Sequence, residues 1–134
     1  MPIGDAKMGG IAAEDIGKCA YGIFKQGESA IGKKIGIAGD QLTGDEMAAA
    51  MSKALGEPVY YNKVPADVYR GFGFPGADDL GNMFQIYDEF EGPFRAVRSV
   101  DESKKLAPSL MNFDQWLTKN KSRIELEEGA AAKK

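Results

Sequence analysis

Apolar residues recur at helical spacing in the first half of the chain, and this pattern predicts two amphipathic helices. The first is expected from Glu14 to Lys25, because acidic residues occupy its first turn and Gly27 follows its last apolar position. The second is expected from Thr43 to Leu55, because Thr43 begins a capping-box pattern and a glycine follows Leu55.

Three further helices are expected in the second half of the chain. A short one follows Pro65. A longer one follows Pro75 and stops at Gly92, and its large apolar residues lie on one side of the helix. The last begins after Asn112, which can cap it together with the glutamine three residues on. Residues 94–111 show no helical period and are expected to be irregular.

Extended segments are expected to be short and few. Residues 7–13 are predicted as a strand or an extended segment, and 35–39 and 59–64 as strands, because they are rich in β-branched, aromatic or small apolar residues. The strands near 35–38 and 59–64 are expected to form a small sheet, and glycine inside the first predicts close approach of a neighbouring backbone. The whole pattern predicts a mixed α/β fold with about four or five helices and about two to four short strands.

Composition and charge narrow the range of functions. With 134 residues and 43% apolar residues, the chain suits one globular domain. The net charge of -3 argues against a basic face that follows a phosphate backbone, so no nucleic-acid contact is expected. No apolar run reaches about 18 residues, so no membrane partner is expected. Because the start has no signal-peptide pattern, the cytoplasm is the expected location, with the nucleus as an additional one.

The inventory of reactive side chains limits the chemistry further. The chain contains no histidine and a single cysteine, Cys19. Bases, metal ligands and nucleophile pairs that depend on histidine are therefore excluded, as are a zinc site and an internal disulfide. Cys19 is expected to be a buried or half-buried thiol, and no metal site is expected.

Two motifs match catalytic signatures without the structural context that these signatures need. Gly71, Gly73 and Gly76 fit the spacing GxGxxG, but the residues before them are predicted to be helical, whereas a dinucleotide loop must follow a strand. Tyr21 and Lys25 fit the YxxxK spacing of short-chain dehydrogenases, a spacing that also arises by chance on any helix. We therefore assign no catalytic and no cofactor-binding residue in this chain.

Four stretches in this order resemble the carboxyl-terminal half of NmrA-like proteins, which are atypical short-chain-dehydrogenase relatives, and especially their NADPH redox-sensor branch. The stretches are EDIG at 14–17, IGKKIGIAG at 31–39 followed by LT at 42–43, GFPGADDLGNMF at 73–84 and FDQWL at 113–117. The first two are shared among atypical short-chain dehydrogenases, the third is more specific, and the fourth supports it. The resemblance covers about residues 4–126.

The resemblance implies a parent protein whose Rossmann half binds NADP(H), and that half is not contained in this sequence. It implies the helix-rich carboxyl-terminal part of an NmrA-like Rossmann protein, with a few short strands and no complete Rossmann sheet. Residues 1–126 would then form a region that caps a ligand or partner, and 127–134 a disordered tail. The missing half or another protein would be its partner, and the surface left uncovered predicts self-association.

The function that the resemblance implies is the non-catalytic, ligand- or partner-binding part of an NADP(H)-responsive redox sensor or regulator. Phe72, Phe74, Phe84 and Tyr87 come from one loop and helix, and such a group can line an apolar pocket. Packing in the core is the alternative for these side chains. Two other functions stay open: part of an NADPH-dependent oxidoreductase acting on small carbonyl compounds, and a free-standing interaction or oligomerisation protein.

Overall fold

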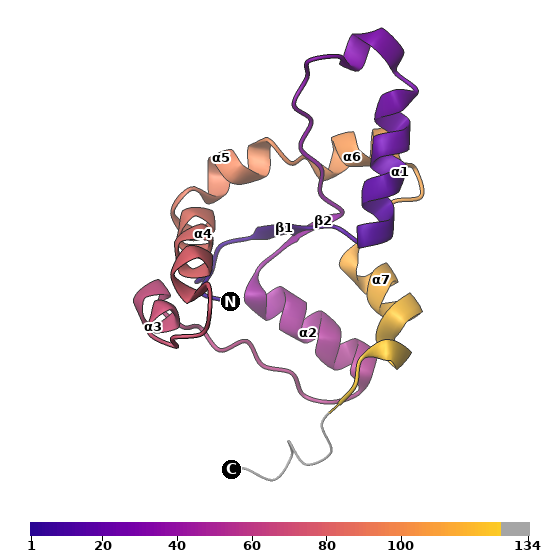
Figure 1. Cartoon of the computed structure of the whole chain (residues 1–134). Coiled ribbons are helices and arrows are strands. Elements are labelled where there is room, and N and C mark those ends of the chain that lie inside the picture. Colours follow the sequence, from indigo (N-terminus) through magenta and orange to yellow (C-terminus); the bar gives the residue numbers. More distant parts are fainter. Residues whose placement is uncertain (127–134) are drawn as a thin grey trace.

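The computed structural model describes residues 1–126, and α-helices and 3-10 helices together form more than half of this part of the chain (Figure 1). In chain order, the elements are β1 (Met8–Gly10), α1 (Ala13–Phe24), the 3-10 helix η1 (Gly27–Ala30), β2 (Asp40–Leu42), α2 (Gly44–Leu55), α3 (Ala66–Arg70), α4 (Ala77–Glu89), α5 (Glu91–Ala96), α6 (Val100–Leu106), α7 (Phe113–Asn120) and the 3-10 helix η2 (Lys121–Arg123). The expected class is confirmed, because the described part is helix-rich α/β with one two-stranded sheet and no complete Rossmann sheet. The tail expected at 127–134 lies outside the described residues.

The helix boundaries that capping patterns predict are confirmed at α2 and α7. The Thr43 hydroxyl accepts a hydrogen bond from the Glu46 N–H at 3.1 Å, and the Glu46 carboxylate accepts one from the Thr43 N–H at 2.8 Å. Asn112 and Gln115 form the same reciprocal pair at the start of α7. Gly56 ends α2 in the left-handed conformation with φ 74°, which glycine adopts without a steric penalty from Cβ.

The sheet is an antiparallel pair of β1 and β2, and its register decides what each face carries. Met8 lies opposite Leu42 and Gly10 lies opposite Asp40, so these four residues share one face. The middle pair faces the other side, where the Gln41 amide donates a 2.7 Å hydrogen bond to a backbone carbonyl just after α5. The sheet therefore presents one face toward α2 and α7 and the other toward α5.

The strand expected at 59–64 is wrong. These residues have no neighbouring strand, and the N–H of Val59 donates instead to the hydroxyl oxygen of Ser52 in α2, at 2.8 Å. That hydroxyl in turn donates to the carbonyl oxygen of Ala48 at 2.9 Å. A side chain of α2 thus satisfies a backbone group that a strand partner would otherwise satisfy. The sheet expected between 35–38 and 59–64 does not form.

The strand expected at 35–39 is also wrong, because strand pairing starts only at β2. The N–H of Ala38 donates to the buried hydroxyl of Ser103 at 2.9 Å rather than to a neighbouring strand. The close backbone approach expected in this segment is confirmed. A Cβ atom on Gly36 would lie 1.9 Å from the carbonyl oxygen of Val97, so only glycine fits there.

The expectation that 94–111 is irregular is wrong, because this range contains the second half of α5 and all of α6. Gly92 and Pro93, expected to end the preceding helix, lie in the first turn of α5, where a proline N–H is not needed. Ser99 caps α6 by accepting a 3.2 Å hydrogen bond from the Glu102 N–H. The two helices have 6 and 7 residues, too few for a helical period to show in the sequence.

A small core lies where α1 meets α6 and the segment that follows it. Cys19 is fully buried there and packs with Ala107 and Leu110. Its thiol approaches the carbonyl oxygen of Ser103 at 3.9 Å, and burial raises the pKa of Cys19 above the ordinary value. The expectation of a buried thiol is therefore confirmed.

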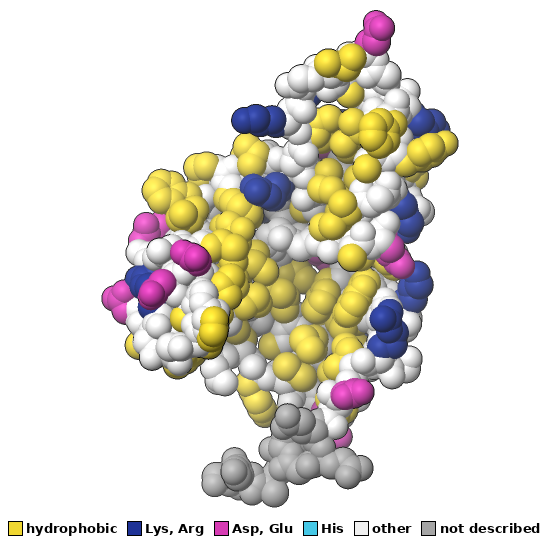
Figure 2. Space-filling view, in the orientation of Figure 1, with side chains coloured by type: hydrophobic (Ala, Val, Ile, Leu, Met, Phe, Trp, Pro, Cys, Tyr) yellow, Lys and Arg dark blue, Asp and Glu magenta, His cyan; other side chains and the backbone are white. Residues whose placement is uncertain are grey.

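Hydrophobic side chains cover a broad part of the face seen in Figure 1. Figure 2 shows them extending from α1 at the top, across the centre, to α2 and α7 below, while acidic side chains gather over α3 and α4 on the left. Large apolar residues on the surface include Phe24, Tyr60 and Ile31, which are 81%, 80% and 77% exposed. Within residues 1–126, none of the helices combines the length and the apolar character that a membrane span requires.

Candidate ligand-binding site

The four aromatic residues expected to line a pocket lie together beside α3 and α4. Their link is Tyr69 of α3, whose ring centroid lies 5.7, 5.5 and 5.8 Å from those of Phe72, Phe74 and Phe84. Phe84 contacts Tyr87 in turn, at 6.3 Å. Phe84 is buried, whereas Phe72 and Phe74 remain exposed. The structure thus brings all four into one aromatic cluster through a residue that the sequence did not single out.

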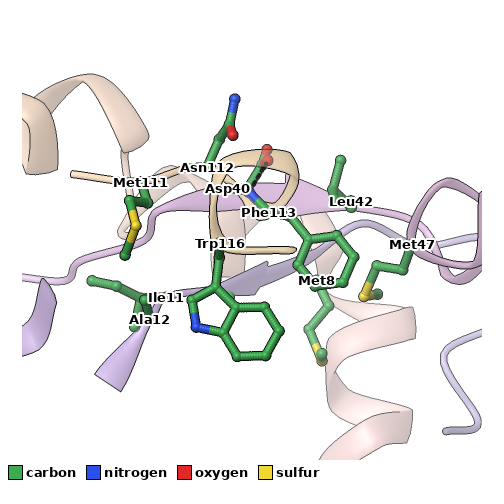
Figure 3. A pocket seen from close by; sticks show the side chains of 11 residues that line it. Met8, Ile11, Ala12, Asp40, Leu42, Met47, Met111, Asn112, Phe113 and Trp116 are labelled. Atoms are coloured by element: carbon green, nitrogen blue, oxygen red, sulfur yellow. Dashed lines mark hydrogen bonds between the residues drawn. The ribbon is translucent and has the colours of Figure 1, made fainter. Parts of the chain in front are cut away.

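An apolar cavity lies elsewhere, on the face of the sheet opposite α5 (Figure 3). Its volume is about 260 Å³, it opens to solvent on one side, and its walls come from three parts of the chain that are distant in sequence. The lining residues are Met8, Gly10, Ile11, Ala12, Asp40, Leu42, Met47, Met111, Asn112, Phe113 and Trp116. None of the four residues of the aromatic cluster is among them.

One wall follows from the register of the sheet. Met8, Gly10, Asp40 and Leu42 share a face, and all four line the cavity. Met47 continues this wall from the first turns of α2, whose start is fixed by its capping box. Gly10 contributes no side chain to this wall, and a Cβ atom added there would have no other atom within 4 Å.

The opposite wall comes from the start of α7. The rings of Phe113 and Trp116 are parallel to within 5°, and their centroids lie 6.4 Å apart. Figure 3 shows the two rings side by side, with the thioether of Met111 at one edge and that of Met47 at the other. The capping box at Asn112 fixes the first turn of α7, and the spacing of three residues places both rings on one side of the helix.

Asp40 connects the two walls. One oxygen of its carboxylate accepts a hydrogen bond from the Gln41 N–H at 2.9 Å, and the other accepts one from the Phe113 N–H at 3.1 Å. Both oxygens are therefore engaged by backbone donors, which holds the first turn of α7 against β2. Among the described residues that line the cavity, Asp40 is the only ionisable one.

A second carboxylate, from Asp15, fixes the segment that leads into α7. Asp15 is fully buried, and its oxygens accept hydrogen bonds from the Lys18 ammonium at 2.6 Å and from the Met111 N–H at 2.8 Å. Burial alone would raise the pKa of Asp15, but these hydrogen bonds and the charge of Lys18 outweigh it and hold the pKa below the ordinary value. Asp15 thus ties α1 to the wall that carries Met111.

The motifs that resemble catalytic signatures lie away from the cavity. The glycine loop at 71–76 follows helix α3, and Asp78 and Asp79 occupy the first turn of α4 behind it. Because these carboxylates repel phosphate, the loop does not fit the diphosphate of NADP(H). Tyr21 is 66% exposed, with the Lys25 ammonium 5.5 Å from the centroid of its ring. Among residues 1–126, no group of acidic or thiol side chains converges to hold a metal ion.

The opposite face of the sheet carries a wider and more open depression around Gln41, Arg95 and Ser99. Its polar groups already bond one another. The Arg95 guanidinium donates to the Gln41 side chain at 2.9 Å, and the Ser99 hydroxyl caps α6. The apolar cavity beside α7 is therefore the better candidate for a ligand.

Parts of this cavity lie in segments that the sequence patterns single out, but no pattern indicates that these segments meet. Met47 lies within the amphipathic helix that the sequence predicts from Thr43 to Leu55, and Phe113 and Trp116 belong to the FDQWL stretch of the resemblance. Met8 and Gly10 fell within an expected extended segment. The missing information was the register of β1 against β2, which joins residues about 30 positions apart and leaves no local pattern.

Comparison with known proteins agrees with this architecture. A crystal structure of a nucleoside-diphosphate-sugar epimerase from Staphylococcus aureus shares the fold, with a TM-score of 0.71 and 21% sequence identity. The alignment covers 87% of this chain and 42% of that protein, so the chain spans less than half of its length. The NmrA-like family matches residues 1–117, which is most of the 134-residue chain. The chain therefore belongs to the NmrA-like family.

Proposed function

We propose that this chain is the non-catalytic, ligand- or partner-binding part of an NmrA-like regulator that responds to NADP(H). The observation that carries the proposal is the apolar cavity between the sheet and α7. Concave sites with mostly apolar walls and few polar groups are the usual form of small-molecule sites. The capping boxes and the buried Asp15 hold these walls in place without a ligand, so the site is preformed.

The polar groups at the cavity favour binding over catalysis. Acid–base catalysis needs a side chain within reach of the reacting atom and free to exchange a proton with it. Asp40 lines the cavity, but both of its oxygens accept backbone hydrogen bonds. Tyr21 and Lys25, which have the spacing of a catalytic pair, are not among the lining residues.

The response to NADP(H) is proposed from family membership and from the resemblance to the redox-sensor branch. The residues of this chain do not fit the dinucleotide in the 71–76 loop, where the first turn of α4 is acidic. We therefore assign dinucleotide binding to a region other than residues 1–126, which belongs either to the same protein or to a partner protein. The cavity beside α7 is the part that we assign to this region.

The complete product of the gene provides the test. Calorimetry measures the binding of NADPH, and nicotinamide absorbance measures its oxidation in the presence of small apolar aldehydes and ketones. We expect saturable binding without oxidation above the rate found in the absence of protein. Steady oxidation would contradict the non-catalytic assignment and favour an NADPH-dependent oxidoreductase acting on small carbonyl compounds. A failure to bind NADPH would contradict the response to NADP(H).

A matched variant separates the two catalytic possibilities if oxidation occurs. Tyr21→Phe removes the hydroxyl of the YxxxK pair and leaves the exposed ring in place. Oxidation that this variant abolishes would assign catalysis to Tyr21, contrary to its position outside the cavity. Oxidation that it leaves unchanged would come from another group.

A further inference from the structure

One wall of the cavity beside α7 consists of two parallel aromatic rings, and these rings bear on the kind of ligand that the cavity accepts. The parallel rings of Phe113 and Trp116 lie side by side, with 6.4 Å between their centroids (Figure 3). Aromatic faces prefer other rings in offset-stacked arrangements. We propose that this cavity binds a planar aromatic compound of about two fused rings, neutral or positively charged. The inference rests on the proposed function, because it names the ligand class of the same site.

The size of the cavity sets the size of the ligand. An apolar cavity of about 150 Å³ holds benzene, so the volume of about 260 Å³ accommodates roughly two fused rings. Met8, Met47 and Met111 surround the space. Thioethers make favourable contacts with the edges of aromatic rings, and the flexible methionine side chain adapts to the outline of a ligand.

The charge of the wall selects against anions. Asp40 contributes a carboxylate, and none of the described lining residues is a lysine or an arginine. An anion entering the cavity would lose its hydration and approach a like charge without a counter-ion. A cation would instead gain from the carboxylate and from the faces of the two rings. Neutral and positively charged rings are therefore expected to bind better than negatively charged ones.

The methionines of the chain provide a readout with an internal control. The chain has 6 methionines. Met8, Met47 and Met111 line the cavity, whereas Met1, Met51 and Met83 do not. Methyl NMR of the whole chain therefore reports binding in the cavity separately from contact with other apolar surface. A ligand of the proposed class shifts the three cavity methyl signals saturably and leaves the other three in place.

Four probes of matched size separate shape from charge. They are naphthalenemethanol, N-methylquinolinium, naphthoate and the saturated analogue decahydronaphthalenemethanol. We expect naphthalenemethanol and N-methylquinolinium to bind at least about 3-fold more tightly than the saturated analogue, because only planar rings stack. We expect naphthoate to bind at least about 10-fold more weakly than naphthalenemethanol, because of Asp40. Equal binding of planar and saturated probes, preference for naphthoate, or no shift of the cavity methyl signals would each overturn the inference.

Two variants assign the selectivity to the aromatic wall. Trp116→Leu keeps an apolar side chain but removes the larger ring, so the planar probes are expected to lose about 3-fold or more in affinity while the saturated probe changes little. Phe24→Leu is the matched control, because Phe24 is 81% exposed and lies outside the cavity. Equal losses for planar and saturated probes in Trp116→Leu would contradict stacking. These results are independent of NADPH binding, so failure of this inference is distinguishable from failure of the proposed function.

Discussion

Asp15 joins α1 to the segment that leads into α7 through a single buried side chain. Because the Met111 N–H and the Lys18 ammonium both donate to it, replacing the carboxylate weakens two hydrogen bonds to a charged group. Asp15→Asn is expected to lower the free energy of unfolding by about 1–3 kcal/mol. Urea unfolding measures this loss. Glu14→Gln is the matched control on the same turn, where the exposed ion pair with Lys119 is expected to contribute about 0.5 kcal/mol or less.

The same residue makes a prediction about pH. Folding lowers the pKa of Asp15 below its ordinary value of 3.8, so its ionised form stabilises the fold above that value. This contribution is lost as the pH falls through the folded pKa. The difference in stability between the natural chain and Asp15→Asn is therefore expected to be full above about pH 5 and to shrink toward about pH 3. A difference that stays constant over this range would contradict the assignment.

The sequence predicted the position of Asp15 but not its role. An acidic residue in the first turn of a helix is explained by the helix dipole alone. The hydrogen bond to Met111 spans 96 positions in the sequence, and no local sequence pattern predicts it. Tyr69, which joins the predicted aromatic residues into one cluster, was missed for the same reason. Its partners come from the loop and helix that follow, and only their packing brings the rings together.

Two glycines in α1 test the packing of that helix against α6. Gly22 faces the end of α6, where a Cβ atom would lie 2.2 Å from the carbonyl oxygen of Leu106, whereas a Cβ on Gly17 would meet nothing within 4 Å. Gly22→Ala is expected to lower the free energy of unfolding by about 1–3 kcal/mol, because backbone must move. Gly17→Ala is expected to raise it by about 0.5–1 kcal/mol through helix propensity. Thermal unfolding of both variants measures the contrast, and equal effects would contradict the observed packing.

At the scale of elements, prediction succeeded where the signal is local. The capping boxes at Thr43 and Asn112 and the glycine after α2 each occupy a few adjacent residues, and the structure confirms all three. The strands at 35–39 and 59–64 failed because a strand also needs a partner, and the partners here are side chains of α6 and α2. The helices α5 and α6 were missed because they are too short to show a period.

Many large apolar side chains of residues 1–126 are exposed to solvent instead of packing in the core. Phe24, Tyr60 and Ile31 are at least 77% exposed, and Figure 2 shows a broad hydrophobic face. We expect the chain to self-associate, because extensive exposed apolar surface favours contacts between molecules. Sedimentation velocity at increasing concentration should show a rising mean mass, and sulfate should strengthen the effect. A monodisperse monomer at every concentration would contradict the expectation.

We propose that the cavity between the sheet and α7 is the ligand site of this chain. Prodan, a neutral naphthalene dye whose emission depends on polarity, tests it with one pair of variants. Gly10 lies on the same face of the sheet as Met8 and Asp40, and this face lines the cavity. Gly10→Leu therefore adds a side chain inside the cavity, and no atom lies within 4 Å of the added Cβ. Gly17→Leu makes the same change at an open position on α1, outside the cavity.

The measurement is the saturable blue shift of Prodan emission, recorded for the natural chain and both variants after circular dichroism has verified their folding. The natural chain and Gly17→Leu are expected to bind the dye alike, while Gly10→Leu is expected to lose at least about 10-fold in affinity because its side chain occupies the space. Undiminished binding by folded Gly10→Leu would mean that the dye binds elsewhere and would contradict the assignment of this cavity as the ligand site.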